Sequence, residues 1–119
     1  MVSEHVEQRE FVQWFRQNVP YIIYAIPNGG SRGRLEGARM KCEGVLAGIP
    51  DLHVPALKLW IEMKRVGGRA SPAQLQIHER LRREGQTVVI CEGKQQAIDV
   101  VTQELERRGE KPQRRERNG

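Results

Sequence analysis

The chain of 119 residues contains little cysteine and little histidine. Its two cysteines, Cys42 and Cys91, form no CxxC pair and have no Cys/His spacing that suits zinc, so we interpret both as reduced, structural residues. The histidines His5, His53 and His78 are scattered and form no HExxH motif. These residue types therefore predict neither a disulfide nor a zinc site.

Long hydrophobic runs are also missing. No apolar segment approaches the ~18 residues of a membrane-spanning helix. Residues 1–10 are acidic and polar, unlike a secretory signal peptide, so we expect a cytoplasmic location. The length fits one domain, and 38% apolar with 29% charged residues excludes collagen-like, mucin-like and wholly disordered classes.

The net charge of +5 lies mostly near the C-terminus. Residues 107–119 contain six lysines and arginines against two glutamates, and the remainder of the chain is close to neutral. We expect residues 1–108 to form the folded domain and residues 109–119 to be a basic disordered tail. Such a tail can hold DNA phosphates or simply keep the protein soluble.

Local patterns predict alternating helices and strands. Helices are expected at residues 3–17, 34–43, 71–84 and 94–108, and strands at 21–26, 51–54, 57–64 and 87–91. The short connection between the second and third strands makes them antiparallel, whereas the later strand–helix–strand unit favours a parallel pair. The order α-β-α-β-β-α-β-α therefore predicts an α/β fold with a mixed sheet flanked by helices.

Three charged residues on the two central strands have the pattern of a hydrolytic site. Asp51 opens one strand, and Glu62 and Lys64 lie on one face of the next strand, roughly 6.5–7 Å apart. Two converging carboxylates repel, so they need a cation or a shared proton. Oxygen ligands without a thiolate favour Mg²⁺ or Mn²⁺, and a metal, carboxylates and a lysine suit phosphodiester hydrolysis. An ExK pattern on a strand is also typical of a plain solvated face.

A larger set of motifs is specific to one family. The run Gly48–Leu52 followed by Ile61–Lys64 resembles the PD-(D/E)XK nuclease signature. More narrowly, the chain resembles the VRR-NUC family, the virus-type replication-repair nucleases, over nearly all residues from Ser3 to Val101. The ordered motifs that carry this resemblance are Glu7-Gln8, Ile26–Gly30, Glu43-Gly44, Gly48–Leu52, Ile61–Lys64, Gly67-Gly68, Ser71–Gln74 and His78–Gly85. The resemblance implies a restriction-endonuclease-like mixed sheet with flanking helices.

The resemblance also implies roles for individual residues. Asp51 and Glu62 would be metal ligands, together with the backbone carbonyl of Met63, and Lys64 would position water or stabilise the transition state. An acid on the first helix would complete the site, and we choose Glu7, with Glu4 as the alternative. Gln74 matches a glutamine that lines the family's active site, although it can equally form a capping box with Ser71. His78 is more readily explained as a packed or exposed histidine than as a site residue.

Residues that could contact DNA lie in a loop that matches the family and in basic segments on or beside a helix and near Lys64. Candidates are Asn28, Gly29 and Gly30 in a loop, Arg32, Arg34, Arg39 and Lys41 along or beside one helix, and Arg65 and Arg69 near Lys64. The loop can equally be a plain turn, and the basic helix a solvated surface.

The resemblance implies a Mg²⁺- or Mn²⁺-dependent endonuclease acting on branched DNA such as Holliday junctions. It further implies a homodimer, in a bacterium or a phage-infected cell. A non-catalytic DNA-binding module, a flap or nicking nuclease and a restriction-type nuclease remain alternatives.

Overall fold

The computed structural model describes residues 2–27 and 34–114, with only the backbone for residues 34–36. The elements, in chain order, are α1 (Glu4–Asn18), β1 (Tyr24–Ala25), α2 (Arg34–Cys42), β2 (Leu52–Val54), the 3₁₀ turn η1 (Pro55–Leu57), β3 (Leu59–Lys64), α3 (Pro72–Arg83), β4 (Thr87–Glu92) and α4 (Lys94–Arg107). This order confirms the predicted sequence of helices and strands.

The four strands form one mixed sheet in the order β1-β2-β3-β4. β2 is antiparallel to both β1 and β3, with Leu52 opposite Ile61, whereas β3 and β4 are parallel, with Glu62 opposite Ile90. The parallel pair is connected through α3, as a crossover between parallel strands requires. The mixed sheet predicted from the sequence is therefore confirmed.

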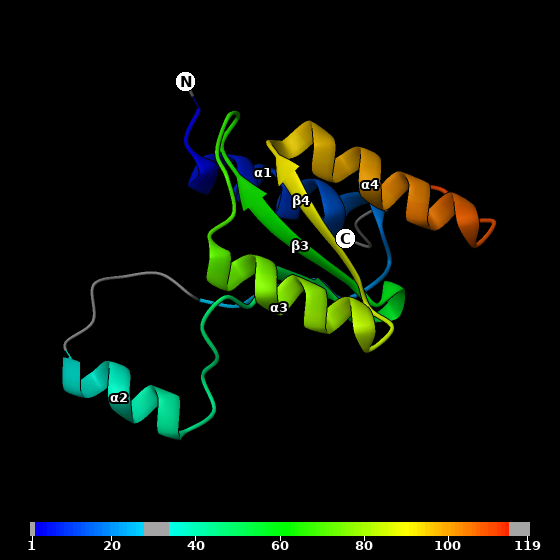
Figure 1. The fold of residues 1–119 in the computed structure, drawn as a ribbon. Coiled ribbons are helices and arrows are strands. Elements are labelled where there is room, and N and C mark those ends of the chain that lie inside the picture. Colours follow the sequence, from blue (N-terminus) through cyan, green and yellow to red (C-terminus); the bar gives the residue numbers. More distant parts are fainter. Residues whose placement is uncertain (1, 28–33, 115–119) are drawn as a thin grey trace, which may run out of the picture.

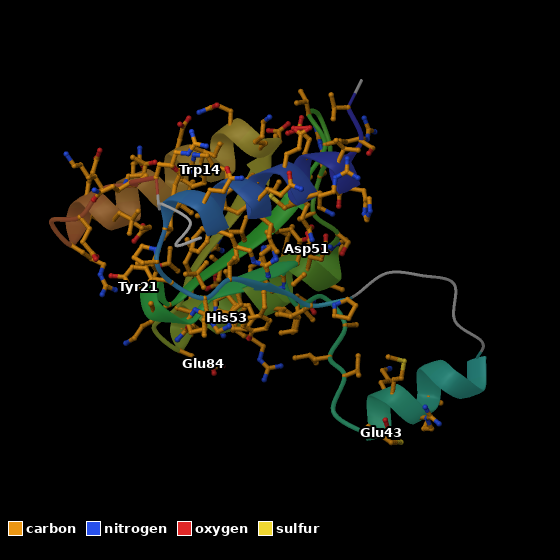
Figure 2. All side chains as sticks on the ribbon, turned by 180° about the vertical axis from the view of Figure 1, so that it is seen from behind. Trp14, Tyr21, Glu43, Asp51, His53 and Glu84 are labelled. Atoms are coloured by element: carbon orange, nitrogen blue, oxygen red, sulfur yellow. The ribbon has the colours of Figure 1, made fainter. Side chains whose placement is uncertain are left out.

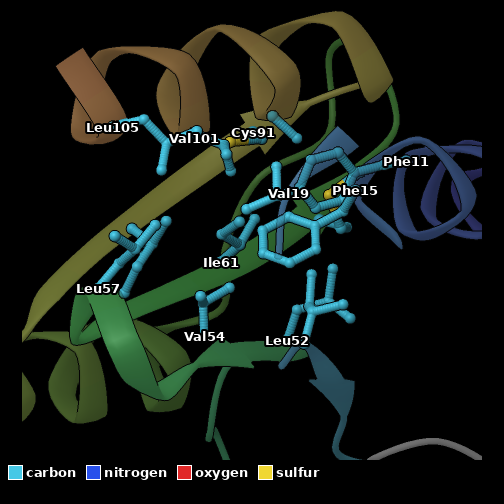
Figure 3. Packing of buried hydrophobic residues seen from close by; sticks show 14 residues of the cluster. Phe11, Phe15, Val19, Leu52, Val54, Leu57, Ile61, Cys91, Val101 and Leu105 are labelled. Atoms are coloured by element: carbon cyan, nitrogen blue, oxygen red, sulfur yellow. The ribbon is translucent and has the colours of Figure 1, made fainter. Parts of the chain in front are cut away.

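Helices cover both faces of this sheet. α1 and α4 pack together on one face, and α3 lies against the other (Figure 1). Alternation along β3 buries Leu59, Ile61 and Met63 completely under α1 and α4, which directs Trp60, Glu62 and Lys64 to the α3 face. Figure 3 shows the core between the sheet and these two helices, with Phe11, Phe15, Val19, Leu52, Val54, Leu57, Ile61, Cys91, Val101 and Leu105. The charged residues of β3 thus lie outside the main apolar core.

Two strands are shorter than the sequence predicted. The expected strand 57–64 begins only at Leu59, because η1 precedes it and Lys58 adopts a left-handed conformation with φ 50°. The expected strand 21–26 is reduced to Tyr24–Ala25, since the three-residue β2 offers it few partners and Ile22 is 71% exposed. Tertiary pairing therefore limits both strands more than their β-branched composition does.

The cysteines and the C-terminal segment differ in part from expectation. Both cysteines are free, but only Cys91 is buried; Cys42 is exposed on α2 and is not part of the core, so its structural assignment was wrong.

The segment after Gly109 is not free at its start: the amide of Gln113 donates to the carbonyl of Asn18 at 2.8 Å, and the hydroxyl of Tyr21 donates to Glu110. Residues 115–119 lie outside the described residues.

α2 lies apart from the sheet and the other helices (Figure 1). Among the described helices, none is both long and apolar enough to cross a membrane.

Candidate active site

Asp51 is held at the start of β2 by contacts on several sides. The preceding loop lies so close to α3 that a Cβ on Gly48 (φ +88°) would lie 2.7 Å from the carbonyl oxygen of Ala73, so only glycine fits there. The carbonyl of Asp51 accepts from the amide of Ile26 at 2.8 Å, and its Oδ2 accepts from the amide of Met63 at 2.8 Å. Figure 2 shows Asp51 on the body of the molecule, well separated from Glu43 on α2.

Glu62 is a buried carboxyl group beside Asp51. Its side chain is 1% exposed. Burial, followed by the hydrogen bond and the negative charge of Asp51, raises the pKa of Glu62 to about 9, against a smaller opposing effect of Lys64. Without a cation this carboxylate pair therefore retains a proton at neutral pH. A divalent cation bound between the two groups would take the place of that proton.

The backbone of Met63 offers a third oxygen ligand. The paired residues of β2 and β3 end at Leu52–Ile61, and the chain reaches β2 through Pro50 and Asp51, where Asp51 lies in a bend. The amide of Met63 is used by Asp51, and proline has no N–H to donate to the Met63 carbonyl. The N–H and C=O of one strand residue point to the same side, so this carbonyl faces Asp51. Sequence analysis named the Met63 carbonyl, and the structure adds that the amide of the same residue is engaged by the side chain of Asp51.

Lys64 follows on the same face of β3 as Glu62, where its positive charge lowers the pKa of Glu62. Within the described part of the chain its ammonium group forms no ion pair. The loop after β3 is tied back to β4, because the amide of Gly67 donates to Glu92 Oε1 at 2.6 Å. Arg65 and Arg69 are exposed in this loop, close in sequence to Lys64.

α3 brings two further polar residues to this face. Ser71 and Gln74 form a complete capping box, in which Gln74 Oε1 accepts from the amide of Ser71 at 2.7 Å. The capping interpretation of Gln74 is thus realised, and it leaves the amide nitrogen of the side chain available. One turn later, His78 is fully buried and its Nε2 lies 3.2 Å from Glu62 Oε1. Its spacing of four residues from Gln74 was the only sequence feature that pointed to this contact.

The two candidate acids of α1 have different surroundings. Glu7 Oε2 accepts from the amide of Lys94 at 2.5 Å, so Glu7 caps the N-terminus of α4, where the N-cap residue Gly93 has no side chain to do so. Glu4 is close enough to the site for its negative charge to raise the pKa of Glu62, although this is the smallest of the causes after burial, Asp51 and Lys64. Glu7, our first choice from the sequence, therefore contacts the N-terminus of α4.

Several sequence-based candidates for DNA contact do not join this cluster. Asn28, Gly29, Gly30 and Arg32 lie outside the described residues. Arg39 and Lys41 are exposed on α2, apart from the sheet, and Arg39 lies 3.5 Å from Glu43 in an ion pair.

The donor set suits a hard divalent cation. Asp51, Glu62 and the Met63 carbonyl supply only oxygen atoms, and Mg²⁺ commonly takes one or two carboxylates and completes its coordination with water. In the described part of the chain, no group of three or more His, Cys, Asp or Glu side chains is arranged to hold a metal. Protein side chains alone would therefore leave several coordination positions to the backbone, water and substrate.

Comparison with known proteins supports one family. No family model and no curated protein matches the sequence. A solved structure, a VRR_NUC domain protein, is similar with a TM-score of 0.71 and 29% identity, over 89% of this chain and 90% of that chain. This similarity supports membership of the VRR-NUC family. The neighbour suggests a nuclease domain, and VRR-NUC nucleases generally depend on a divalent metal ion.

Proposed function

We propose that this VRR-NUC domain is a Mg²⁺- or Mn²⁺-dependent endonuclease that hydrolyses phosphodiester bonds in DNA. The observation that carries the proposal is the buried carboxyl group of Glu62 beside Asp51, a pair of oxygen donors whose mutual repulsion a cation would relieve. Asp51, Glu62 and the Met63 carbonyl would hold the metal, which when bound polarises the phosphate and activates water.

Lys64 has the position and charge for the second part of this chemistry. Hydrolysis forms a bond between a water oxygen and phosphorus and breaks the bond from phosphorus to one sugar oxygen. Negative charge grows on the phosphoryl oxygens during this step, and an ammonium group beside them stabilises it. Gln74, with its side-chain amide nitrogen outside the capping box, would orient the water or the phosphate. Arg65 and Arg69 are exposed nearby and would contact the DNA backbone.

We further propose branched DNA as the substrate and a homodimer as the active form, in the cytoplasm of a bacterium or a phage-infected cell. A four-way junction has approximate two-fold symmetry and needs two cuts, whereas one chain carries one site, so a symmetric pair matches it. Light scattering at micromolar concentration should give twice the mass of the 119-residue chain. A monomer that still cuts both strands would contradict the dimer.

Cleavage of a four-way junction, a flap and a linear duplex, each with and without Mg²⁺, tests the function. We expect Mg²⁺-dependent cleavage with the junction cut fastest. Faster cutting of the flap would indicate a flap nuclease, and cutting of the duplex at fixed sequences a restriction-type enzyme. DNA binding without any cleavage in Mg²⁺ or Mn²⁺ would leave a non-catalytic module.

Glu4, not Glu7, is the acid of α1 that we assign to the metal site, directly or through water. Both residues lie in the first turn of α1, so Glu4→Ala and Glu7→Ala are matched in their effect on the helix dipole. We expect Glu4→Ala to weaken Mn²⁺ binding several-fold. Glu7→Ala should instead lower stability by about 1 kcal/mol through loss of the α4 cap, with Mn²⁺ affinity unchanged. Calorimetric titration and thermal unfolding measure the two effects, and the reverse pattern would restore Glu7 as the site acid.

Pro50→Ala tests the carbonyl of Met63. An alanine at position 50 would add an N–H just before Asp51, which we expect to compete with the metal for this carbonyl. Because one hydrogen bond contributes about 1 kcal/mol, we expect Mn²⁺ affinity to fall roughly fivefold. Pro55→Ala, at the other end of β2, is the matched control and should leave the affinity unchanged. Equal affinity in Pro50→Ala and the wild type would remove Met63 from the ligand set.

A further inference from the structure

His78 is a fully buried polar residue that the proposed reaction has not yet used. It lies on α3, 0% exposed, and its Nε2 is 3.2 Å from Oε1 of the equally buried Glu62. It therefore reaches neither bulk water nor a DNA strand. A direct role in bond breaking is excluded by this burial, whereas a role through Glu62 is not.

The hydrogen-bond direction between the two residues follows from the rest of the ring. Burial, with smaller effects of the positive charges of Arg82 and Lys64, lowers the pKa of His78, which favours a neutral ring and a hydrogen bond to Glu62. Among the described residues, Nδ1 is buried without a partner. A proton on Nδ1 would be an unpaired buried N–H donor, which folded proteins rarely contain. The proton therefore belongs on Nε2, which donates to Glu62.

The surroundings hold His78 firmly. Its neighbour Ile77 is buried, the capping box fixes the start of α3, and the Gly48 loop packs against Ala73 in the first turn. A donor on such a rigid element fixes the orientation of the carboxylate that it contacts. With Oε1 of Glu62 engaged by His78, Oε2 is the oxygen left for a metal.

We propose that His78 is a positioning residue, which holds Glu62 through an Nε2–H hydrogen bond so that its second oxygen is presented to the divalent cation. This inference rests on the proposed function, because it gives Glu62 the role of a ligand. Partners that orient metal-binding groups typically contribute 10- to 100-fold to metal affinity or activity.

Three substitutions of His78 distinguish the effect of the Nε2–H donor from the effect of the shape of the ring. The amide nitrogen of glutamine is as many bonds from Cβ as Nε2 of histidine, whereas that of asparagine matches Nδ1 and is too short to reach Glu62. We expect His78→Gln to bind Mn²⁺ within about threefold of the wild type, and His78→Asn and His78→Leu to bind 10- to 100-fold more weakly. Saturating Mn²⁺ should restore most of the cleavage rate of His78→Asn.

The measurement is calorimetric titration of the DNA-free full chain with Mn²⁺, with circular dichroism to verify folding. Should His78→Leu not fold, the two amide variants still give the comparison. Equal Mn²⁺ affinity in His78→Asn and the wild type would overturn the positioning role, and so would equal losses in His78→Asn and His78→Gln. In both cases the proposed function stands if Glu62→Gln abolishes Mn²⁺ binding. A wild-type protein that binds no Mn²⁺ and cuts no DNA would overturn the proposed function itself.

Discussion

Glu62→Gln should abolish DNA cleavage and at the same time make the metal-free protein more stable. Loss of one ligand of the proposed metal is expected to reduce the rate by about 10³-fold or more. The uncharged amide keeps an oxygen that accepts from His78, and it removes a carboxyl group whose ionisation is opposed by burial and by Asp51. We therefore expect this variant to have a higher melting temperature and no cleavage activity.

The pH dependence of this stabilisation has a defined sign. Between the ordinary pKa of 4.5 and the raised value of about 9, the folded protein holds a proton on Glu62 that the unfolded chain has released. Raising the pH through this range therefore destabilises the wild type, and the substitution removes the effect. The gain in stability from Glu62→Gln should be small near pH 5 and grow toward pH 9. A gain of ~1 kcal/mol corresponds to roughly 5 °C in Tm.

Thermal unfolding in EDTA at pH 5, 7 and 9, followed by a junction-cleavage assay in Mg²⁺, measures both effects. Glu79→Gln is the matched control, since Glu79 lies on α3 with its side chain 56% exposed and should change neither property. Wild-type cleavage by Glu62→Gln would refute the site assignment. A pH-independent difference in Tm would instead show that Glu62 is ionised in the folded, metal-free protein.

Lys64→Ala should reduce the rate of cleavage by roughly 10²-fold or more while leaving DNA and metal binding largely intact. The expectation follows from loss of one positive charge beside the reacting phosphate. Since Lys64 also lowers the pKa of Glu62, its removal makes that carboxyl harder to ionise. Metal binding by the variant should therefore need a higher pH than in the wild type, with less than a tenfold loss of Mn²⁺ affinity at pH 9.

Single-turnover cleavage with saturating Mg²⁺, together with DNA binding in Ca²⁺, distinguishes these effects. Lys58→Ala removes the same charge just before the opposite end of β3 and should retain full activity. If Lys64→Ala fails to bind DNA and its bound fraction reacts at the normal rate, Lys64 is a phosphate clamp without a catalytic role.

Much of the site could be predicted from the sequence because it depends on local rules. Side chains alternate along a strand, so Glu62 and Lys64 share a face wherever the strand lies. The Ser71–Gln74 capping box is a contact within one helical turn, and both of its hydrogen bonds are present. The directions of the β2–β3 and β3–β4 pairs followed from the lengths of their connections. The family motifs were recognisable for the same reason, since each is a short run of residues.

Other features were decided by contacts between segments distant in the sequence. Glu4 and Glu7 are one turn apart on α1, and only the packing of α4 decides that Glu7 meets the amide of Lys94. The short β1 and the exposed Cys42 likewise depend on what the neighbouring segments cover.

The sequence by itself thus determined the fold class, the resemblance to the VRR-NUC family and the shared face of Glu62 and Lys64. Only the tertiary structure brought His78 against Glu62 and the side chain of Asp51 against the amide of Met63. The physical reason is that the protonation of Glu62 and the availability of the Met63 carbonyl depend on burial and on which groups lie within hydrogen-bonding distance. Residues far apart in the chain create those conditions together, and no local pattern specifies them.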